Sequence, residues 1–242
     1  MSGTFRFKRF SVRNEFSSMK VNTDGVLLGA WAAIAPQVRR ILDVGTGTGV
    51  IALMMAQRTE GFAHPVSITG VDVEQVGEAR ANADASPWGG RISFLQEDVR
   101  QYAPSERFDL IVSNPPFFVS ELLPPDAGRM RARHAVTLPY DALRDAAARM
   151  LDPAGRFAVI LPAAEARLFV DVCKGTLVPV RRTDVRTIPR RAPKRVLLEF
   201  AAAGEDAALP GLRHDELVIG TGEHERYTEE YRALTRDFYL KF

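Results

Sequence analysis

The chain has 242 residues, of which 46% are hydrophobic and 26% are charged, and its formal net charge is +2. These values suit a globular protein of one large or two small domains, and no run of about 18 uncharged apolar residues is present to span a membrane. A single cysteine, Cys173, excludes an intramolecular disulfide framework. Together with an amino terminus that lacks an apolar signal core, it favours a reducing, cytoplasmic location.

Short apolar runs alternate with helical patterns through the first two thirds of the chain. The patterns predict strands at 40–44, 66–73, 92–95, 108–113 and 155–161, and helices at 50–56, 78–85 and 140–151. Strands that are separated by helices in this way are typical of a doubly wound α/β sheet in which the strands are mostly parallel.

The last third of the chain departs from this alternation. Residues 177–188 and 195–201 predict two antiparallel strands joined by a basic, proline-containing turn, and 201–210 resembles a flexible surface segment. Thr228 is a suitable N-cap for a final helix, whose apolar face predicts core packing. That face comprises Tyr227, Tyr231, Leu234 and Phe238.

Basic side chains are concentrated in two segments. Residues 1–40 carry seven basic and two acidic side chains, a net charge of +5, and residues 181–195 carry seven basic and one acidic, a net charge of +6. Dense lysine and arginine suit a polyanionic partner such as RNA, because they neutralise phosphates and release counterions. Solvated basic loops explain the charge pattern equally well.

The residues Asn114-Pro115-Pro116-Phe117 follow the strand at 108–113 directly. Proline lacks a backbone donor, so the strand has to end there and the chain has to turn. Such a turn offers two acceptors, the Asn114 side chain and a proline carbonyl, beside the ring of Phe117. This combination suits a planar conjugated amine, whose two hydrogens bind the acceptors while its flat group stacks on the ring.

A second motif, Asp43-Val44-Gly45-Thr46-Gly47-Thr48-Gly49, lies between the first core strand and the following helix. In an open α/β sheet this turn is at the carboxyl edge, where ligands bind. Its Gly-x-Gly-x-Gly spacing differs from that of dinucleotide-binding and nucleotide-triphosphate loops. The glycines therefore indicate either close approach of backbone to a ligand or a structural tight turn.

Two acidic residues follow the next two strands. Asp72 ends the strand at 66–73, where a carboxylate can bind both ribose hydroxyls, and Asp98 follows the strand at 92–95, where it can bind an exocyclic amine of adenine. Each could instead be a helix cap or a turn acid. Their order with the glycine turn and Asn114-Pro115-Pro116-Phe117 favours a nucleoside-containing ligand.

In this order, the motifs resemble those of the class I S-adenosylmethionine-dependent amino methyltransferases that act on adenine or glutamine nitrogens. The flanking segments narrow the resemblance to the bacterial tRNA (valine) adenine-37 N6-methyltransferases, and it runs essentially end to end. It departs from that family at Phe117, where relatives often have tyrosine, so a hydroxyl hydrogen bond is lost. The flanking segments are Phe5 to Phe10, Met19 to Trp31, Ala132-Arg133-His134, Leu138 to Leu143 and Tyr227 to Phe242.

The resemblance implies one Rossmann-like methyltransferase domain over residues 1–242. We expect a basic N-terminal extension at 1–38, a core of seven mostly parallel strands with an antiparallel C-terminal strand at 39–203, and a C-terminal segment at 204–242. The implied activity is methylation of N6 of adenine 37 in a valine tRNA, bound through its anticodon loop. The implied cofactor is S-adenosylmethionine, with no metal, no membrane and no obligate protein partner.

The resemblance also implies a role for individual residues. We expect the catalytic residues to be Asn114, Pro115, Pro116 and Phe117. The expected cofactor-binding residues are Lys20, Thr23, Asp43, Gly45, Thr46, Gly47, Gly49, Asp72, Val73, Asp98, Val99 and Asn114. The expected RNA-binding residues are Arg6, Lys8, Arg9, Arg133, His134, Arg190, Arg191, Lys194 and Arg195.

Several other functions share part of this pattern. A protein-glutamine N5-methyltransferase and an rRNA guanine-N2 methyltransferase could use the same four residues, because a carboxamide and a guanine amine are also planar and conjugated. A nicotinamide oxidoreductase is disfavoured by the glycine spacing. An inactive RNA-binding module is disfavoured because both the glycine turn and the Asn-Pro-Pro-Phe motif are intact.

Overall fold

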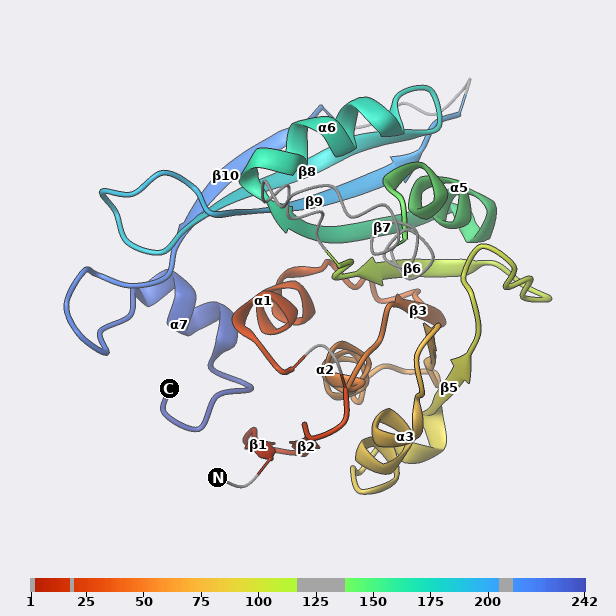
Figure 1. Cartoon of the computed structure of the whole chain (residues 1–242), viewed down its shortest axis with the longest axis horizontal. Coiled ribbons are helices and arrows are strands. Elements are labelled where there is room, and N and C mark those ends of the chain that lie inside the picture. The colour runs from red at the N-terminus through yellow and green to blue at the C-terminus, as the bar shows by residue number, and fades with distance from the viewer. Residues whose placement is uncertain (1–2, 18–19, 117–137, 205–210) are drawn as a thin grey trace, which may run out of the picture.

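An eight-stranded sheet forms the centre of the computed structural model, which describes residues 3–17, 20–116, 138–204 and 211–242 (Figure 1). Across the sheet the strands follow the order β10-β8-β9-β7-β6-β3-β4-β5. Their bounds are β3 (Arg40–Val44), β4 (Ser67–Asp72), β5 (Ile92–Gln96), β6 (Phe108–Ser113), β7 (Leu151–Pro162), β8 (Leu177–Arg186), β9 (Arg195–Ala202) and β10 (Arg213–Val218).

Seven of the eight strands run in one direction. β9 is antiparallel to both of its neighbours, β7 and β8, and every other pairing in the sheet is parallel. The predicted mostly parallel α/β sheet with an antiparallel C-terminal strand is therefore confirmed. Because β8 runs in the same direction as β7, the end of β8 lies at the carboxyl edge of the sheet, together with the ends of β3, β4, β5 and β6.

The sheet has one strand more than the seven that we expected. β10 comes from the segment after residue 204 and pairs in parallel with β8 from Arg213–Arg181 to Val218–Arg186. It is an edge strand in which only Leu217 is buried, so its sequence, Arg-His-Asp-Glu-Leu-Val, carries little of the hydrophobic pattern that identifies a strand.

Helices cover both faces of the sheet. α1 (Thr23–Trp31), α2 (Val50–Arg58) and α3 (Gly77–Asp84) pack on one face, and α5 (Tyr140–Met150) and α6 (Ala163–Cys173) pack on the other (Figure 1). Successive residues of a strand point to opposite faces of the sheet. Ile41 therefore lies in the core under α1, α2 and α3, and Leu42 lies in the core under α5 and α6. A short 3-10 helix, η1 (Gly89–Arg91), precedes β5.

The N-terminal extension packs against the C-terminal segment. A hairpin of β1 (Thr4–Arg6) and β2 (Ser11–Arg13) places Phe7 against Phe10, with ring centroids 4.5 Å apart, and near Tyr239, at 6.2 Å. The backbone N–H of Lys8 donates to the carbonyl of Phe238 at 2.8 Å. We call these contacts between residues 4–13 and 236–242 the terminal clasp.

The predicted final helix is α7 (Glu229–Thr235). The hydroxyl of Thr228 accepts a hydrogen bond from the N–H of Tyr231 at 3.2 Å, which confirms the predicted N-cap. Of the predicted apolar face, Tyr231 and Phe238 are buried in the core and Leu234 packs against it partly buried, whereas Tyr227 precedes the helix and is 39% exposed. No helix in the described residues is both long enough and apolar enough to cross a membrane.

Candidate active site

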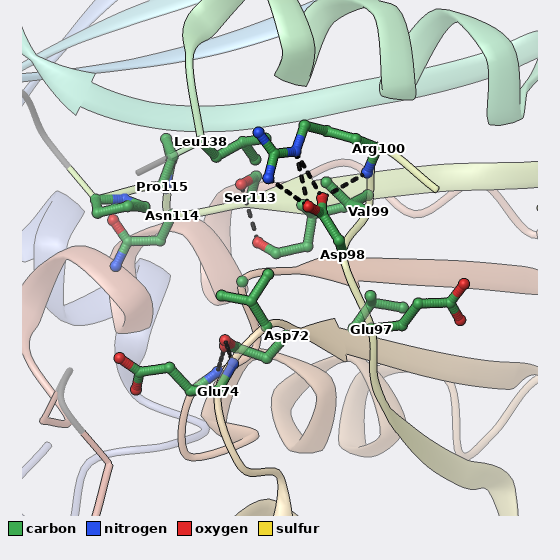
Figure 2. Close-up of a pocket in the computed structure, with 16 residues that line it drawn as sticks. Asp72, Glu74, Glu97, Asp98, Val99, Arg100, Ser113, Asn114, Pro115 and Leu138 are labelled. Atoms are coloured by element: carbon green, nitrogen blue, oxygen red, sulfur yellow. Dashed lines mark hydrogen bonds and ion pairs between the residues drawn. The ribbon is translucent and has the colours of Figure 1, made fainter. Parts of the chain in front are cut away.

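A cavity of about 280 Å³ opens at the carboxyl edge of the sheet, where β3, β4, β5 and β6 end. Ligand sites of open α/β sheets lie at this edge, and the volume is near the lower end of the range for small-molecule sites. The cavity is lined by Val44, Gly45, Gly47, Val71, Asp72, Val73, Glu74, Glu97, Asp98, Val99, Arg100, Ser113, Asn114, Pro115, Pro116 and Leu138 (Figure 2).

The glycine turn after β3 adopts a backbone that side chains disfavour. Gly45, Gly47 and Gly49 have φ values of 73°, 53° and 79°, in the left-handed region that glycine tolerates. A Cβ at Gly49 would lie 2.9 Å from the ring of Phe94, so this position excludes a side chain on packing grounds as well. Gly45 and Gly47 line the cavity, whereas Gly49 is the N-cap of α2.

Asp43 lies beneath this turn and outside the lining of the cavity. It is fully buried, and one carboxylate oxygen accepts from the Thr46 hydroxyl at 2.7 Å and from the Ala52 N–H at 3.2 Å. Burial raises the pKa of Asp43 to about 7, against the opposing effect of these two hydrogen bonds. Asp43 and Thr46 thus hold the turn in place from below.

Asp72 connects the glycine turn to the loop after β4. Its carboxylate accepts from the N–H of Gly47 at 2.9 Å and from the N–H of Glu74 at 3.0 Å. Burial raises the pKa of Asp72 above its ordinary value, although both hydrogen bonds favour the charged form. A carboxylate has about four acceptor positions, so two backbone donors leave capacity for the hydroxyls of a ribose.

Asp98, after β5, is held by Arg100. The guanidinium of Arg100 donates from Nε to both carboxylate oxygens, at 2.9 and 2.8 Å, and its Nη2 also donates to Oδ2 (Figure 2). The Arg100 side chain lowers the pKa of Asp98 below its ordinary value, and the carboxylate therefore stays charged near neutral pH. We did not expect this arginine in the cavity.

The Asn114-Pro115-Pro116 segment follows β6 directly. Ser113 is buried and donates from its hydroxyl to the Val44 carbonyl at 2.9 Å, which ties the end of β6 to the end of β3. Asn114 is 5% exposed, and it lies with Pro115 at one end of the cavity while Glu97 lies at the other (Figure 2). Phe117 lies outside the described residues.

The structure brings together most of the expected catalytic and cofactor-binding residues. Those on the cavity lining are Gly45, Gly47, Asp72, Val73, Asp98, Val99, Asn114, Pro115 and Pro116. Lys20 and Thr23 are not on it, and the Lys20 ammonium instead donates to the carbonyls of Asn14 and Glu15, both at 2.7 Å.

Sequence reasoning missed the remaining lining residues: Val44, Val71, Glu74, Glu97, Arg100, Ser113 and Leu138. Val44, Val71 and Ser113 are at strand ends, and that position was a usable signal. No such signal marks Arg100, because its place in the cavity depends only on the conformation of its side chain, which turns back toward Asp98.

The expected RNA-binding residues fall into different settings. Arg6, Arg190 and Arg191 are exposed, whereas Lys8 donates to the carbonyls of Arg236 and Phe242 within the terminal clasp. Arg9 forms an ion pair with Glu60 at 2.6 Å, and Arg195 forms one with Asp24 at 2.7 Å. Arg133 and His134 lie outside the described residues.

These residues fit a nucleoside-containing cofactor. A Cβ at Gly45 would have no atom within 4 Å, so the glycine turn leaves open space beside the cavity. Two carboxylates, Asp72 and Asp98, face the same space from neighbouring strands. Within the described residues, no group of three or more His, Cys, Asp or Glu side chains is arranged to hold a metal ion.

Comparison with solved structures shows the fold. A predicted O-methyltransferase from Agrobacterium tumefaciens has a TM-score of 0.70 and 18% identity, covering 89% of this chain and 96% of that one. The N-methyltransferase NodS from Bradyrhizobium japonicum WM9, solved with S-adenosyl-L-homocysteine, has a TM-score of 0.50 and 20% identity, covering 74% of this chain and 83% of that one. The architecture is therefore that of class I methyltransferases.

Comparison of sequences shows the family. Residues 11–163 match the model of the methyltransferase small domain. A curated tRNA1(Val) (adenine(37)-N6)-methyltransferase from Parabacteroides distasonis is 43% identical over 241 residues, 98% of each chain. One of the same name from Klebsiella pneumoniae subsp. pneumoniae is 43% identical over 98% of this chain and 94% of that one. The chain therefore belongs to the tRNA1(Val) (adenine(37)-N6)-methyltransferase family, within the methyltransferases that contain the small domain.

Proposed function

We propose that this protein transfers the methyl group of S-adenosylmethionine to N6 of an adenine in tRNA, namely adenine 37 beside the anticodon of a valine tRNA. The observation that carries the proposal is that Asn114, Pro115 and Pro116 line the same cavity as the glycine turn and Asp72. Relatives that are 41–44% identical over nearly the whole chain bear this activity in their names, which supports adenine as the target base.

The cofactor supplies a methyl group on a sulfonium centre, which is activated for displacement. Gly45 and Gly47 would allow the backbone to approach its amino acid part, and Asp72 would accept from the ribose hydroxyls. Asp98 would accept from the adenine amine, and Val73 and Val99 would provide apolar contact with the ring. All of these residues line the cavity.

Asn114 and the Pro115 carbonyl then prepare the target nitrogen. The exocyclic nitrogen of adenine is a weak nucleophile because its lone pair is delocalised into the ring. If both of its hydrogens donate to these two acceptors, the nitrogen becomes more tetrahedral and its lone pair is directed at the methyl group. No general base is needed early, because the proton becomes acidic only as the nitrogen gains positive charge.

Orientation and fixed dipoles supply most of the acceleration in this mechanism. Well-aligned intramolecular reactions set an upper scale of about 7 to 11 kcal/mol for orientation. Asn114 is only 5% exposed, which supports the contribution of fixed dipoles, because a polar group in a water-excluded site acts more strongly than in water. Phe117 would add stacking for the extruded base, which leaves its stack more readily in an anticodon loop than in a duplex.

The basic turn between β8 and β9 suits the phosphates of the tRNA. β8 ends at the same edge of the sheet as the strands that form the cavity, so Arg190 and Arg191 in this turn are presented on the side where the base would enter. Both side chains are exposed, as phosphate contacts require.

A methylation assay tests the proposal. Purified protein with S-adenosylmethionine and unmodified valine tRNA should yield N6-methyladenosine at position 37, identified by mass spectrometry of anticodon-loop fragments. The matched control is the same tRNA with guanine at position 37, which should remain unmodified. Methylation of guanine N2 in rRNA, or of glutamine in a protein, with no product in tRNA, would contradict the proposal.

A further inference from the structure

Arg100 occupies a position in the cavity that the proposed reaction does not use. Its guanidinium lies side-on to the Asp98 carboxylate, and Figure 2 shows it extending over Asp98 toward Ser113 and Leu138. The backbone N–H of Arg100 donates to the same carboxylate at 2.9 Å. Three nitrogen atoms of Arg100 therefore donate to the Asp98 carboxylate: Nε, Nη2 and the backbone N.

The backbone that carries this pair is fixed from two sides. The Asp98 carbonyl accepts from the N–H groups of Gln101 and Tyr102 at 2.8 and 3.0 Å, which closes a tight turn after β5. Arg149 of α5 donates to the carbonyls of Val99 and Tyr102 at 3.0 and 2.5 Å. These bonds hold the backbone of the turn, so a rearrangement of this pair involves the side chains of Asp98 and Arg100 and not the turn itself.

The acceptor capacity of Asp98 is nearly exhausted. A carboxylate has about four acceptor positions. Arg100 donates four hydrogen bonds to Asp98, two to each carboxylate oxygen, so it occupies about all of these positions. An adenine amine that binds Asp98 therefore has to displace part of the guanidinium. We propose that Arg100 sets the affinity for adenine-containing cofactors by competing with the adenine amine for the Asp98 carboxylate. The proposal rests on the proposed function only through the binding of an adenine cofactor in this cavity.

The strength of the competition follows from the exposure of the two side chains. Asp98 is 20% exposed and Arg100 is 43% exposed, so solvent screens their attraction. Ion pairs of this kind have a modest effect, which corresponds to about a 1.5- to 5-fold change in a binding constant. Competition of this size lowers affinity without preventing binding.

The competition has the same effect on the methyl donor and on the product S-adenosylhomocysteine, because both carry adenine. Product release limits turnover in many enzymes. When the adenine leaves, Arg100 can return to Asp98 and replace the lost hydrogen bond with its own. Arg100 thus makes dissociation of the product easier, at the expense of cofactor affinity.

Calorimetry with S-adenosylhomocysteine tests the proposal in the absence of RNA. We expect Arg100→Ala to tighten binding by about 1.5- to 5-fold and to slow dissociation. The analogue that carries unsubstituted purine in place of adenine has neither an exocyclic amine nor an N1–H donor, and it should show no such gain. Arg107→Ala is the matched control, because it removes an exposed arginine outside the cavity and should leave both affinities unchanged.

A second background separates competition from a general charge effect. When Asp98→Ala is already present, Arg100→Ala should produce no further gain. Weaker or unchanged binding by Arg100→Ala, or an equal gain for both ligands, would overturn the proposal. If the unmodified protein fails to bind S-adenosylhomocysteine, the proposed function fails too, whereas normal binding with no gain in the variant removes only the role of Arg100.

Discussion

Asn114 is the residue on which the proposed chemistry depends most. We predict that Asn114→Ala lowers kcat at least a hundredfold, because loss of one preorganised polar group of this kind costs about 2.7 to 4 kcal/mol of transition-state stabilisation. Binding of S-adenosylhomocysteine should persist, because the glycine turn and Asp72 are unchanged. Single-turnover kinetics together with calorimetry measure the two effects separately, and near-normal turnover would remove Asn114 from the mechanism.

Asp43 gives a prediction about pH. Its pKa in the folded protein is raised to about 7 from 3.8, so between these values the folded state holds a proton that the unfolded state has lost. The contribution of this group to stability is therefore largest at low pH, falls as pH rises toward 7, and changes little above about 8.

The comparison with Asp43→Asn isolates that contribution from all other titrations. We expect the unfolding free energy of the unmodified protein to fall relative to that of the variant between pH 5 and pH 7. Above pH 7 the difference between the two should level off. Urea unfolding at pH 5, 6, 7 and 8 measures it. A difference that is independent of pH would show that Asp43 is charged throughout this range.

Among the elements, the turn between β8 and β9 carries a prediction about RNA. We expect the double variant Arg190→Glu and Arg191→Glu to weaken tRNA binding at least tenfold and to reduce its salt dependence, because two phosphate contacts are lost. Affinity for S-adenosylhomocysteine should not change. Filter binding across a salt series measures the first effect, and calorimetry measures the second.

A matched control exists at the opposite edge of the sheet. Arg39 and Arg107 are exposed and directly precede β3 and β6, at the amino edge. Replacing both with Glu changes the net charge by the same amount as the Arg190→Glu and Arg191→Glu double variant. Equal loss of RNA binding in the two double variants would show that total charge, and not the turn between β8 and β9, governs association.

Elements with a clear hydrophobic period were predictable from the sequence, and others were not. β6 was placed at 108–113, its observed bounds, because a continuous apolar run ends at two prolines. α1 was missed because Gly25 through Trp31 are all buried, so the helix has no polar face to reveal its period. At the site, strand-end acids were predictable from position, whereas Arg100 depends on a side-chain conformation.

At the scale of the whole molecule, the terminal clasp joins the two ends of the described chain. We predict that Phe7→Ala lowers the unfolding free energy by about 3 kcal/mol or more, because the side chain is buried against Phe10 and Tyr239 and its loss leaves a cavity. In a chain of this size this corresponds to a fall in Tm of about 6 to 12 °C.

Phe16 provides the control within the same extension. It is 88% exposed, so Phe16→Ala removes an equal volume without opening a cavity, and Tm should change little. Differential scanning calorimetry of both variants tests the role of the clasp. Equal falls in Tm would show that the loss comes from the extension in general and not from packing against the C-terminal segment.

The glycine turn constrains the chain in a way that does not depend on any ligand. At Gly45 an added methyl group would have no atom within 4 Å, yet the φ of 73° lies where L-residues are disfavoured. Alanine is therefore disfavoured here by the handedness of the backbone and not by a lack of space. It follows that the backbone path alone requires glycine at position 45, whereas in the proposed function the side chains of Asp72, Asp98 and Asn114 would recognise the ligand.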